Sequence, residues 1–359
     1  MSQLFQPITI RGVTLRNRVV VAPMCQYSAE DGLATHWHMV HLGSRAIGGA
    51  SLIIAEATAV SPEGRITPDD LGIWSDAHAE ALRPVVDFIK AHGAVAGVQL
   101  AHAGRKGARF RPWDGNGPLT DGRAWPLPGP SALAFDADWQ IPEELDAAGM
   151  QAITQDFVNA TKRAVAAGFE VIELHMAHGY LLHTFLSPLS NKRKDAYGGD
   201  LQGRAKFPLE LARAVRAALP DNLPLFIRIS AVDWVEGGLD IEQSVQLCRW
   251  FKEAGADLID CSTGAVVPGE KAPIGPGYQV PVASAIRRQA GIPTGAVGMI
   301  TEPAQAEQIV ALGEADLVLL ARAMLRDPYW PNRAAESLGA EPAWPIQYKR
   351  AVARRRTAW

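Results

Sequence analysis

Cysteine is scarce in this 359-residue sequence, which has three copies, Cys25, Cys248 and Cys261. This usage argues against a disulfide framework and favours a reducing compartment. The sequence also lacks an apolar run long enough to cross a bilayer, and its first residues lack the pattern of a signal peptide. A net charge of −3 gives no general affinity for nucleic acid or for an anionic membrane. We therefore expect a cytoplasmic protein that binds neither.

Apolar runs rich in β-branched residues recur along the chain and alternate with helical segments. The runs cover 18–24, 50–57, 94–102, 169–177, 223–230, 257–264, 292–298 and 315–322. Such near-continuous apolar strands are typical of a parallel sheet that is covered on both faces. In the helical segment 75–93, Ser75 can cap the start and Gly93 the end. Eight units of this kind predict an α/β protein with a (β/α)8 TIM barrel; a doubly wound sheet is the alternative, but the count favours closure.

Three further segments belong to the single barrel domain that we expect over 1–359. Residues 8–16 alternate around Gly12 and predict a hairpin that closes the bottom of the barrel. Residues 103–148 form a long excursion rich in Pro, Gly and Trp after the third strand. Because long loops are uncommon unless they are functional, we expect this excursion to cap a site. The C-terminal tail, 340–359, ends in YKRAVARRRTAW, which has five basic residues and no acidic one.

The active site of a TIM barrel lies at the carboxyl ends of its strands. In chain order these ends carry Pro23, Met24, Cys25, Tyr27, Glu56, Ala57, Gln99, His102, His175, His178, Tyr180, Arg228, Ser262 to Gly264, Gly298, Ala321 and Arg322. Glu56 is the one acidic residue in this set, so we expect no metal site. We also expect no acidic partner for His183, which lies near Ser187 and Ser190, and therefore no catalytic triad.

The remaining polar groups favour an organic cofactor with a phosphate. Gly298, Ala321 and Arg322 follow the last two strands, where barrels bind phosphate through backbone N–H groups. Gln99 can donate and accept hydrogen bonds at once, which suits the edge of a heteroaromatic ring, and Arg228 offers a fixed positive charge. A phosphate and a ring that needs charge stabilisation predict FMN. A barrel isomerase or aldolase that binds its own substrate's phosphate remains an alternative.

Six segments, spread almost end to end, resemble the old yellow enzyme family of FMN-dependent ene-reductases, in its thermophilic-like branch. They are TLRNRVVVAPMCQYSAEDG, GVQLAHAGRK, ELHMAHGYLLHTFLSPLSNKRKDAYGG, DLIDCSTGAV, PTGAVGMIT and LLARAMLRDP. Ala321 departs from the branch, which typically has glycine there, and 103–148 is longer than in its shortest members. Together these segments are far more specific than a shared barrel fold.

The resemblance implies a role for each candidate residue. The flavin ring would lie against Pro23, Met24, Cys25, Ala57, Gln99 and Arg228, and its phosphate against Gly298, Ala321 and Arg322. His175 and His178 would donate hydrogen bonds to a substrate carbonyl oxygen, and Tyr180 would give a proton to the α-carbon. Cys25 would also tune the redox potential of the flavin, and Tyr27 would contact the substrate. His183 receives no role.

The resemblance further implies that NADPH is a transient hydride donor and that activated alkenes are the oxidants, namely enones, maleimides and nitro compounds. No GxGxxG motif follows a strand, so NADPH and alkene would use the same face of the flavin in turn, with ping-pong kinetics. In the stretch QYKR, Arg350 would reach a neighbouring subunit's site, which implies a homodimer or homotetramer. A catalytically idle flavin-binding sensor is a second alternative.

Overall fold

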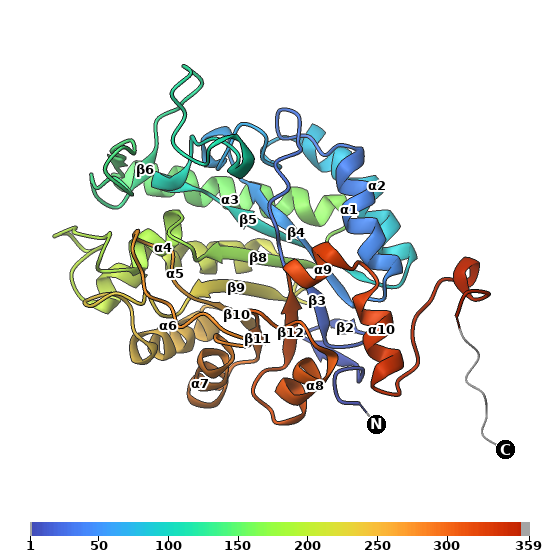
Figure 1. Ribbon diagram of the computed structural model, residues 1–359. Helices are drawn as coiled ribbons and strands as arrows, with labels where there is room; N and C mark the ends of the chain where they lie inside the picture. The colour runs from blue at the N-terminus through green and yellow to red at the C-terminus, as the bar shows by residue number, and fades with distance from the viewer. Residues whose placement is uncertain (1, 353–359) are drawn as a thin grey trace.

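A closed barrel of eight parallel strands forms the centre of the computed structural model, which describes residues 2–352 (Figure 1). In barrel order the strands are β3 (Val19–Val21), β4 (Leu52–Ala59), β5 (Val95–Ala101), β8 (Val171–Met176), β9 (Leu225–Ser230), β10 (Leu258–Ser262), β11 (Thr294–Ala296) and β12 (Leu317–Leu320). Each strand lies beside the next one in the chain, and β12 closes the barrel by pairing with β3, where Val318 faces Val19. The predicted (β/α)8 barrel is confirmed.

Helices cover the outside of the barrel, and successive helices pack against one another around it. The longer ones are α1 (His36–Ile47), α2 (Asp76–Ala91), α3 (Ala147–Ala167), α5 (Leu201–Ala218), α6 (Ile241–Glu253), α7 (Val280–Ala290), α8 (Pro303–Ala311) and α10 (Trp330–Ser337). Ser75 is the N-cap of α2, and Gly93 lies just past its end with φ +72°, as the sequence predicted. Because helices and strands bury their apolar faces against each other, the strands are almost wholly inaccessible to solvent.

The expected N-terminal hairpin consists of β1 (Ile8–Ile10) and β2 (Val13–Leu15). Its turn lies at the end of the barrel where strands begin, because the Gly12 N–H donates to the Asn222 carbonyl at 3.0 Å, just before β9. Arg11 Nε lies 2.9 Å from Asp257 Oδ1, just before β10. A Cβ on Gly12 would lie 2.6 Å from the Asn222 oxygen, so glycine is needed at this close approach.

The long excursion runs from the end of β5 to the start of α3 and lies against the opposite end of the barrel, where strands finish (Figure 1). It holds the short elements η2 (Gly104–Lys106), η3 (Pro112–Asp114), β6 (Pro128–Gly129) and β7 (Glu143–Glu144). Arg105 Nη2 donates to the Val266 carbonyl, beyond β10, at 2.6 Å. The Trp113 ring meets the Tyr27 ring edge-on at 5.7 Å between centroids. The excursion therefore contacts two of the loops that follow strands.

The tail continues past α10 (Figure 1) and includes η4 (Ile346–Tyr348). The Tyr348 ring lies 6.0 Å from that of Tyr329. Arg350 is exposed, and residues 353–359, with the tail's last three arginines, lie outside the described part of the chain. Across residues 2–352, no helix combines the length and the apolar character that a bilayer crossing requires.

Candidate active site

Strand register brings Ala57, Gln99 and Glu173 into one row across β4, β5 and β8. Ala57 faces Gln99, and Gln99 faces Glu173, because a bulge at Glu56 shifts the register of β4. The Gln99 amide donates to Glu173 Oε1 at 2.8 Å, so this carboxyl fixes the orientation of the amide. The bulged Glu56 accepts the Gln26 N–H at 2.6 Å and thereby holds the loop that follows β3.

A second row crosses β8, β9 and β10 and contains His175, Arg228 and Asp260. Arg228 Nε lies 3.1 Å from Asp260 Oδ2, and both side chains are buried. Burial, then the nearby Asp260, raises the pKa of Glu173 to about 8, and burial also raises the pKa of Asp260. The positive charge of Arg228 opposes both shifts, since it lowers the pKa of Glu173 and of Asp260.

These two carboxyl groups correct the expectation that Glu56 is the one acidic group near the site. Glu173 and Asp260 precede His175 and Ser262 by two residues, so they point to the same inner face of the barrel one layer deeper. The alternation of side chains along VIELHM and LIDCS already indicates that Glu173 and Asp260 face the inside of the barrel. A prediction that considers only the last residues of each strand does not include them. Across residues 2–352, no three His, Cys, Asp or Glu side chains are grouped as metal ligands would be.

The rings of His175 and His178 meet edge-on at the end of β8, and His175 Nε2 lies 3.4 Å from His178 Nδ1. The Ala177 N–H donates to His175 Nδ1 at 3.3 Å, so we assign the His175 proton to Nε2. His178 Nε2 lies 2.8 Å from Ser262 Oγ. We assign this hydroxyl as the donor along the short contact, in preference to its 3.4 Å contact with Gln279 Oε1, which places the His178 proton on Nδ1. The two protonated nitrogens, His175 Nε2 and His178 Nδ1, then lie side by side.

Both imidazoles are neutral, because burial, then the charge of Arg228, lowers the pKa of His175 and of His178 well below the usual range. His178 adopts the left-handed region at φ +60°, an uncommon conformation for a residue with a side chain. Such a conformation costs on the order of 1 kcal/mol and persists where the surroundings hold it in place. The Ser230 hydroxyl accepts the His178 N–H at 2.9 Å, and Lys106 Nζ donates to the His178 carbonyl at 2.8 Å.

Tyr180, Tyr27 and Cys25 pack against a small apolar cluster that contains Ala57 and Ala101. The Tyr180 ring meets the His175 ring edge-on at 5.0 Å. Burial raises the pKa of Tyr180 above its usual range, so its hydroxyl keeps its proton. Pro23 and Met24, half-buried directly after β3, complete the group that the sequence placed on this side.

Lys106, at the start of the excursion, belongs to the same site, although the sequence predicts no role for it beyond its place in the segment GVQLAHAGRK. Its ammonium group donates to the carbonyls of His178 and Ala265 at 2.8 and 2.9 Å and lies 5.5 Å from the centre of the Tyr180 ring. Burial, then nearby arginines, lowers the pKa of Lys106 to about 7. The lysine thus ties the excursion to the turn that carries His178.

Beside the histidines, a cavity of about 350 Å³ extends to the ends of β11 and β12. Its lining includes His178, Arg228, Ser262, Gln279, Gly298, Ala321, Arg322 and Arg326. Gly298 has φ +116°, and a Cβ there would lie 2.8 Å from Gln279 Nε2 and 3.1 Å from Tyr278 Cε1. Without a side chain, the backbone at Gly298 can approach a ligand more closely than the backbone of any other residue type could at this position. The cavity joins the predicted phosphate-binding residues to Arg228 and His178.

His183 has an acidic partner, so the prediction that it has none was wrong. Its Nε2 lies 3.1 Å from Asp233 Oδ1, and Ser187 Oγ donates to Asp233 Oδ2 at 2.6 Å. Asp233 follows the end of β9 and was not among the strand-end residues predicted from the sequence. The order Ser–Asp–His differs from that of a nucleophilic triad, in which the histidine lies between the other two.

Comparison with known proteins decides the family. The family model described as NADH:flavin oxidoreductase / NADH oxidase matches residues 3–341. The NADPH dehydrogenase of Geobacillus sp. (strain WCH70) is 49% identical over 351 residues, which are 97% of this chain and 98% of the relative. That of Bacillus subtilis (strain 168) is 47% identical over 350 residues, with the same coverage. The chain belongs to the NADH:flavin oxidoreductase / NADH oxidase family.

Solved structures agree with this assignment to the flavin oxidoreductases. Morphinone reductase superposes with a TM-score of 0.79 and 26% identity, covering 95% of this chain and 91% of that one. The resemblance to the old yellow enzymes is therefore confirmed, and the chain is an oxidoreductase with FMN as its cofactor and NADPH as its reductant. The cavity fits FMN. Gly298, whose backbone is open to a ligand, lines it together with Arg322 and Arg326, which suits a phosphate, and Arg228 also lines it, which suits the flavin ring.

Replacing Gly298 by alanine should weaken FMN binding at least tenfold, because the new Cβ collides with Gln279 and forces an L-residue into φ +116°. Quenching of flavin fluorescence during titration of the apoprotein measures the Kd. Gly275→Ala is the matched control, since a Cβ there meets nothing within 4 Å. Equal affinities of Gly298→Ala and Gly275→Ala for FMN would contradict a role of Gly298 in FMN binding.

Replacing Glu173 by glutamine should stabilise the protein increasingly as the pH rises. Between the usual pKa of 4.5 and about 8, the native wild type keeps a proton that the unfolded chain releases, so its stability falls with pH across this window. Glutamine removes this dependence, and the difference should reach the order of a few kcal/mol. Urea unfolding at pH 5 and pH 8 measures it, with exposed Glu253→Gln as the control. A constant difference between the two pH values would refute the raised pKa.

Proposed function

We propose that this protein is an FMN-dependent ene-reductase that acts on alkenes conjugated to a carbonyl or nitro group. One observation carries the proposal: the neutral rings of His175 and His178 bring His175 Nε2 within 3.4 Å of His178 Nδ1, with the protonated Tyr180 beside His175. Such a pair of donors suits an oxygen that gains negative charge during the reaction. Bound FMN supplies the hydride exchange between NADPH and the alkene.

The residues around the cavity divide the binding of FMN between them. Gly298, Ala321 and Arg322 would hold the phosphate through backbone N–H groups and positive charge. Around the ring, Gln99 presents an amide fixed by Glu173, and Arg228 presents a guanidinium group. The remaining ring contacts would come from Pro23, Met24, Cys25 and Ala57. Burial raises the pKa of the Cys25 thiol, so Cys25 would act on the flavin potential as a neutral group.

His175 and His178 would donate their Nε2–H and Nδ1–H groups to the substrate oxygen, which draws electrons away from the β-carbon. Tyr180 would then give its proton to the α-carbon as the general acid. Its raised pKa keeps the proton in place until the carbanion forms. Tyr27, which packs on the same apolar cluster, would contact the substrate without transferring a proton.

Two peripheral segments would complete the site. The excursion 103–148 would cap it, because Lys106 holds the His178 carbonyl and Trp113 packs against Tyr27. Arg350, exposed on the tail, would reach the site of a neighbouring subunit in a homodimer or homotetramer. NADPH and the alkene would use the same site in turn, which gives ping-pong kinetics.

The two alternatives differ from this proposal in what they predict. A flavin-free isomerase or aldolase is disfavoured by membership of a flavin oxidoreductase family. An idle flavin-binding sensor would bind FMN but would not turn over 2-cyclohexenone or maleimide with NADPH. The uncharged histidine pair and the half-buried, protonated Tyr180 favour catalysis over sensing.

Tyr180→Phe should slow alkene reduction ~100-fold, because it removes the general acid and leaves the ring packing intact. Reduction of the bound flavin by NADPH should change little. Stopped-flow mixing of the pre-reduced variant with 2-cyclohexenone measures the oxidative step. Tyr197→Phe is the matched control, because Tyr197 is half-buried outside the cavity, and it should remain close to the wild type in this step. A Tyr180→Phe rate within twofold of the wild type would rule out this tyrosine as the proton donor.

A further inference from the structure

His183 is a buried histidine that the proposed chemistry does not use. It lies on α4 (Leu181–Leu186), one turn beyond Tyr180, and neither its ring nor its partner Asp233 is accessible to solvent. Burying an ionisable pair is unfavourable unless its hydrogen bonds are satisfied. Where those hydrogen bonds go therefore indicates what the pair does.

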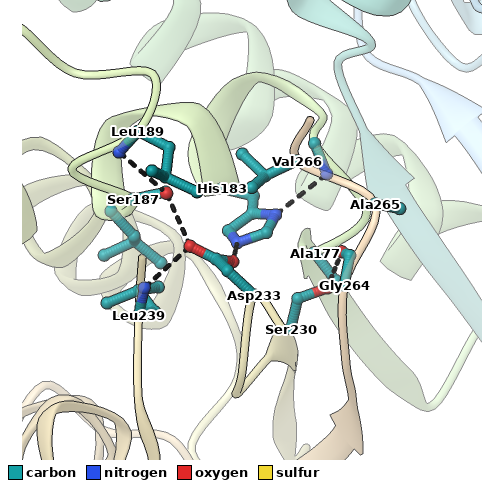
Figure 2. Close-up of polar contacts among 12 residues, drawn as sticks. Ala177, His183, Ser187, Leu189, Ser230, Asp233, Leu239, Gly264, Ala265 and Val266 are labelled. Atoms are coloured by element: carbon teal, nitrogen blue, oxygen red, sulfur yellow. Dashed lines mark hydrogen bonds and ion pairs between the residues drawn. The ribbon is translucent and has the colours of Figure 1, made fainter. Parts of the chain in front are cut away.

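Asp233 gathers hydrogen bonds from three directions. Figure 2 shows its carboxylate between His183 on one side and Ser187 and Leu239 on the other. Oδ2 accepts from the Ser187 hydroxyl at 2.6 Å and from the Leu239 N–H at 2.8 Å, and Oδ1 lies 3.1 Å from His183 Nε2. Burial alone would raise the pKa of Asp233, but these hydrogen bonds hold it below the usual value. The carboxylate is ionised and accepts at both oxygens.

An ionised carboxylate at Nε2 fixes the tautomer of His183. Nε2 must donate to it, so Nδ1 is left with a lone pair, and this nitrogen accepts the Gly179 N–H at 2.9 Å. The chain of hydrogen bonds thus runs from Asp233 through the imidazole to one backbone N–H group. A proton on Nδ1 would face the Gly179 N–H, donor against donor, and would break the chain.

Gly179 is the residue between His178 and Tyr180, so its peptide group sets how those two side chains are placed. It has φ +75°, and a Cβ there would lie 2.3 Å from the Ala265 oxygen, so the turn is tightly confined. Two neighbouring groups of the turn are also held, since the His178 N–H donates to Ser230 and the His178 carbonyl accepts from Lys106. The bond to His183 supplies the restraint at the centre of the turn.

We propose that Asp233 and His183 are positioning residues that hold the turn of His178, Gly179 and Tyr180 in its reactive geometry by fixing the imidazole as the Nε2–H tautomer. This inference rests on the proposed roles of His178 and Tyr180. The Asp233 carboxylate would itself touch neither substrate nor cofactor. It would act through His183 on His178 and Tyr180, the two residues proposed to contact the substrate.

Asp233→Asn tests the tautomer directly. The two donors at Oδ2 will select the amide oxygen, which turns the amide NH2 toward His183 Nε2 and makes that nitrogen an acceptor. The proton then moves to Nδ1, and the Gly179 bond is lost. Ser187→Ala is the matched control, because it removes one hydrogen bond from the same carboxylate and leaves the His183 and Gly179 contacts intact.

A second pair of variants separates positioning from simple packing. His183→Leu removes the acceptor for the Gly179 N–H, whereas His183→Asn keeps an oxygen at the position of Nδ1. If His183 acts through that one bond, the asparagine variant will recover most of what the leucine variant loses. A purely space-filling role would favour leucine instead.

Two readouts are taken on the FMN-loaded protein. Nitrogen-15 NMR of labelled histidine should show His183 as the Nε2–H tautomer in the wild type and in Ser187→Ala, and as the Nδ1–H tautomer in Asp233→Asn. Asp233→Asn and His183→Leu should each weaken phenol binding at least tenfold and slow oxidation of the reduced enzyme by 2-cyclohexenone at least tenfold. Oxidation by molecular oxygen, which needs no placed donor, should stay within twofold of the wild type.

The inference would be overturned if Asp233→Asn kept the tautomer, the phenol affinity and the rate with 2-cyclohexenone of the wild type. It would also be overturned if His183→Leu and His183→Asn lost equal amounts of phenol affinity and enone rate. The proposed function has a separate test, because it fails if the wild type does not reduce 2-cyclohexenone. In that case the tautomer and the phenol affinities still decide whether Asp233 and His183 hold the turn.

Discussion

The left-handed backbone at His178 is the constraint on which the site depends. It reverses the chain directly after β8, so that His178 comes back within 3.4 Å of His175 and the Tyr180 ring comes to lie against His175 from another side. An extended residue at this position would carry the chain away from the barrel mouth. The turn is costly, and Ser230, Lys106 and His183 hold its backbone from three different elements.

The electrostatics of the barrel mouth follow from burial as much as from charge. Both histidines are neutral and Tyr180 is protonated because burial disfavours the charged form of each group, although His178 and Tyr180 keep some exposure to solvent. Beneath them, Arg228 is the fixed positive charge; burial raises the pKa of Glu173 and of Asp260, and Arg228 lowers both. The mouth can therefore present hydrogen-bond donors and the Arg228 cation to an electron-rich ligand.

Sequence patterns predicted the elements and the residues at the strand ends well, because hydrophobic runs, caps and parallel connections are local signals. They did not predict the residues that lie deeper inside the barrel or that are brought together from distant parts of the chain. Glu173 and Asp260 were passed over because they lie one layer below the strand ends, and Asp233 was missed because its partner His183 is fifty residues away. Lys106 was passed over because only the folded excursion brings its ammonium group to the His178 carbonyl. The roles proposed for His175, His178 and Tyr180 came from resemblance rather than from spacing.

The central claim is that His175 and His178 together bind one oxygen. Titration of the oxidised FMN-loaded protein with phenol tests it most directly, because a phenolate bound beside the flavin gives a charge-transfer absorbance band. We predict a clear band for the wild type and its loss, with FMN still bound, when both histidines are replaced by alanine. A band of unchanged intensity and affinity in the double variant would contradict the claim.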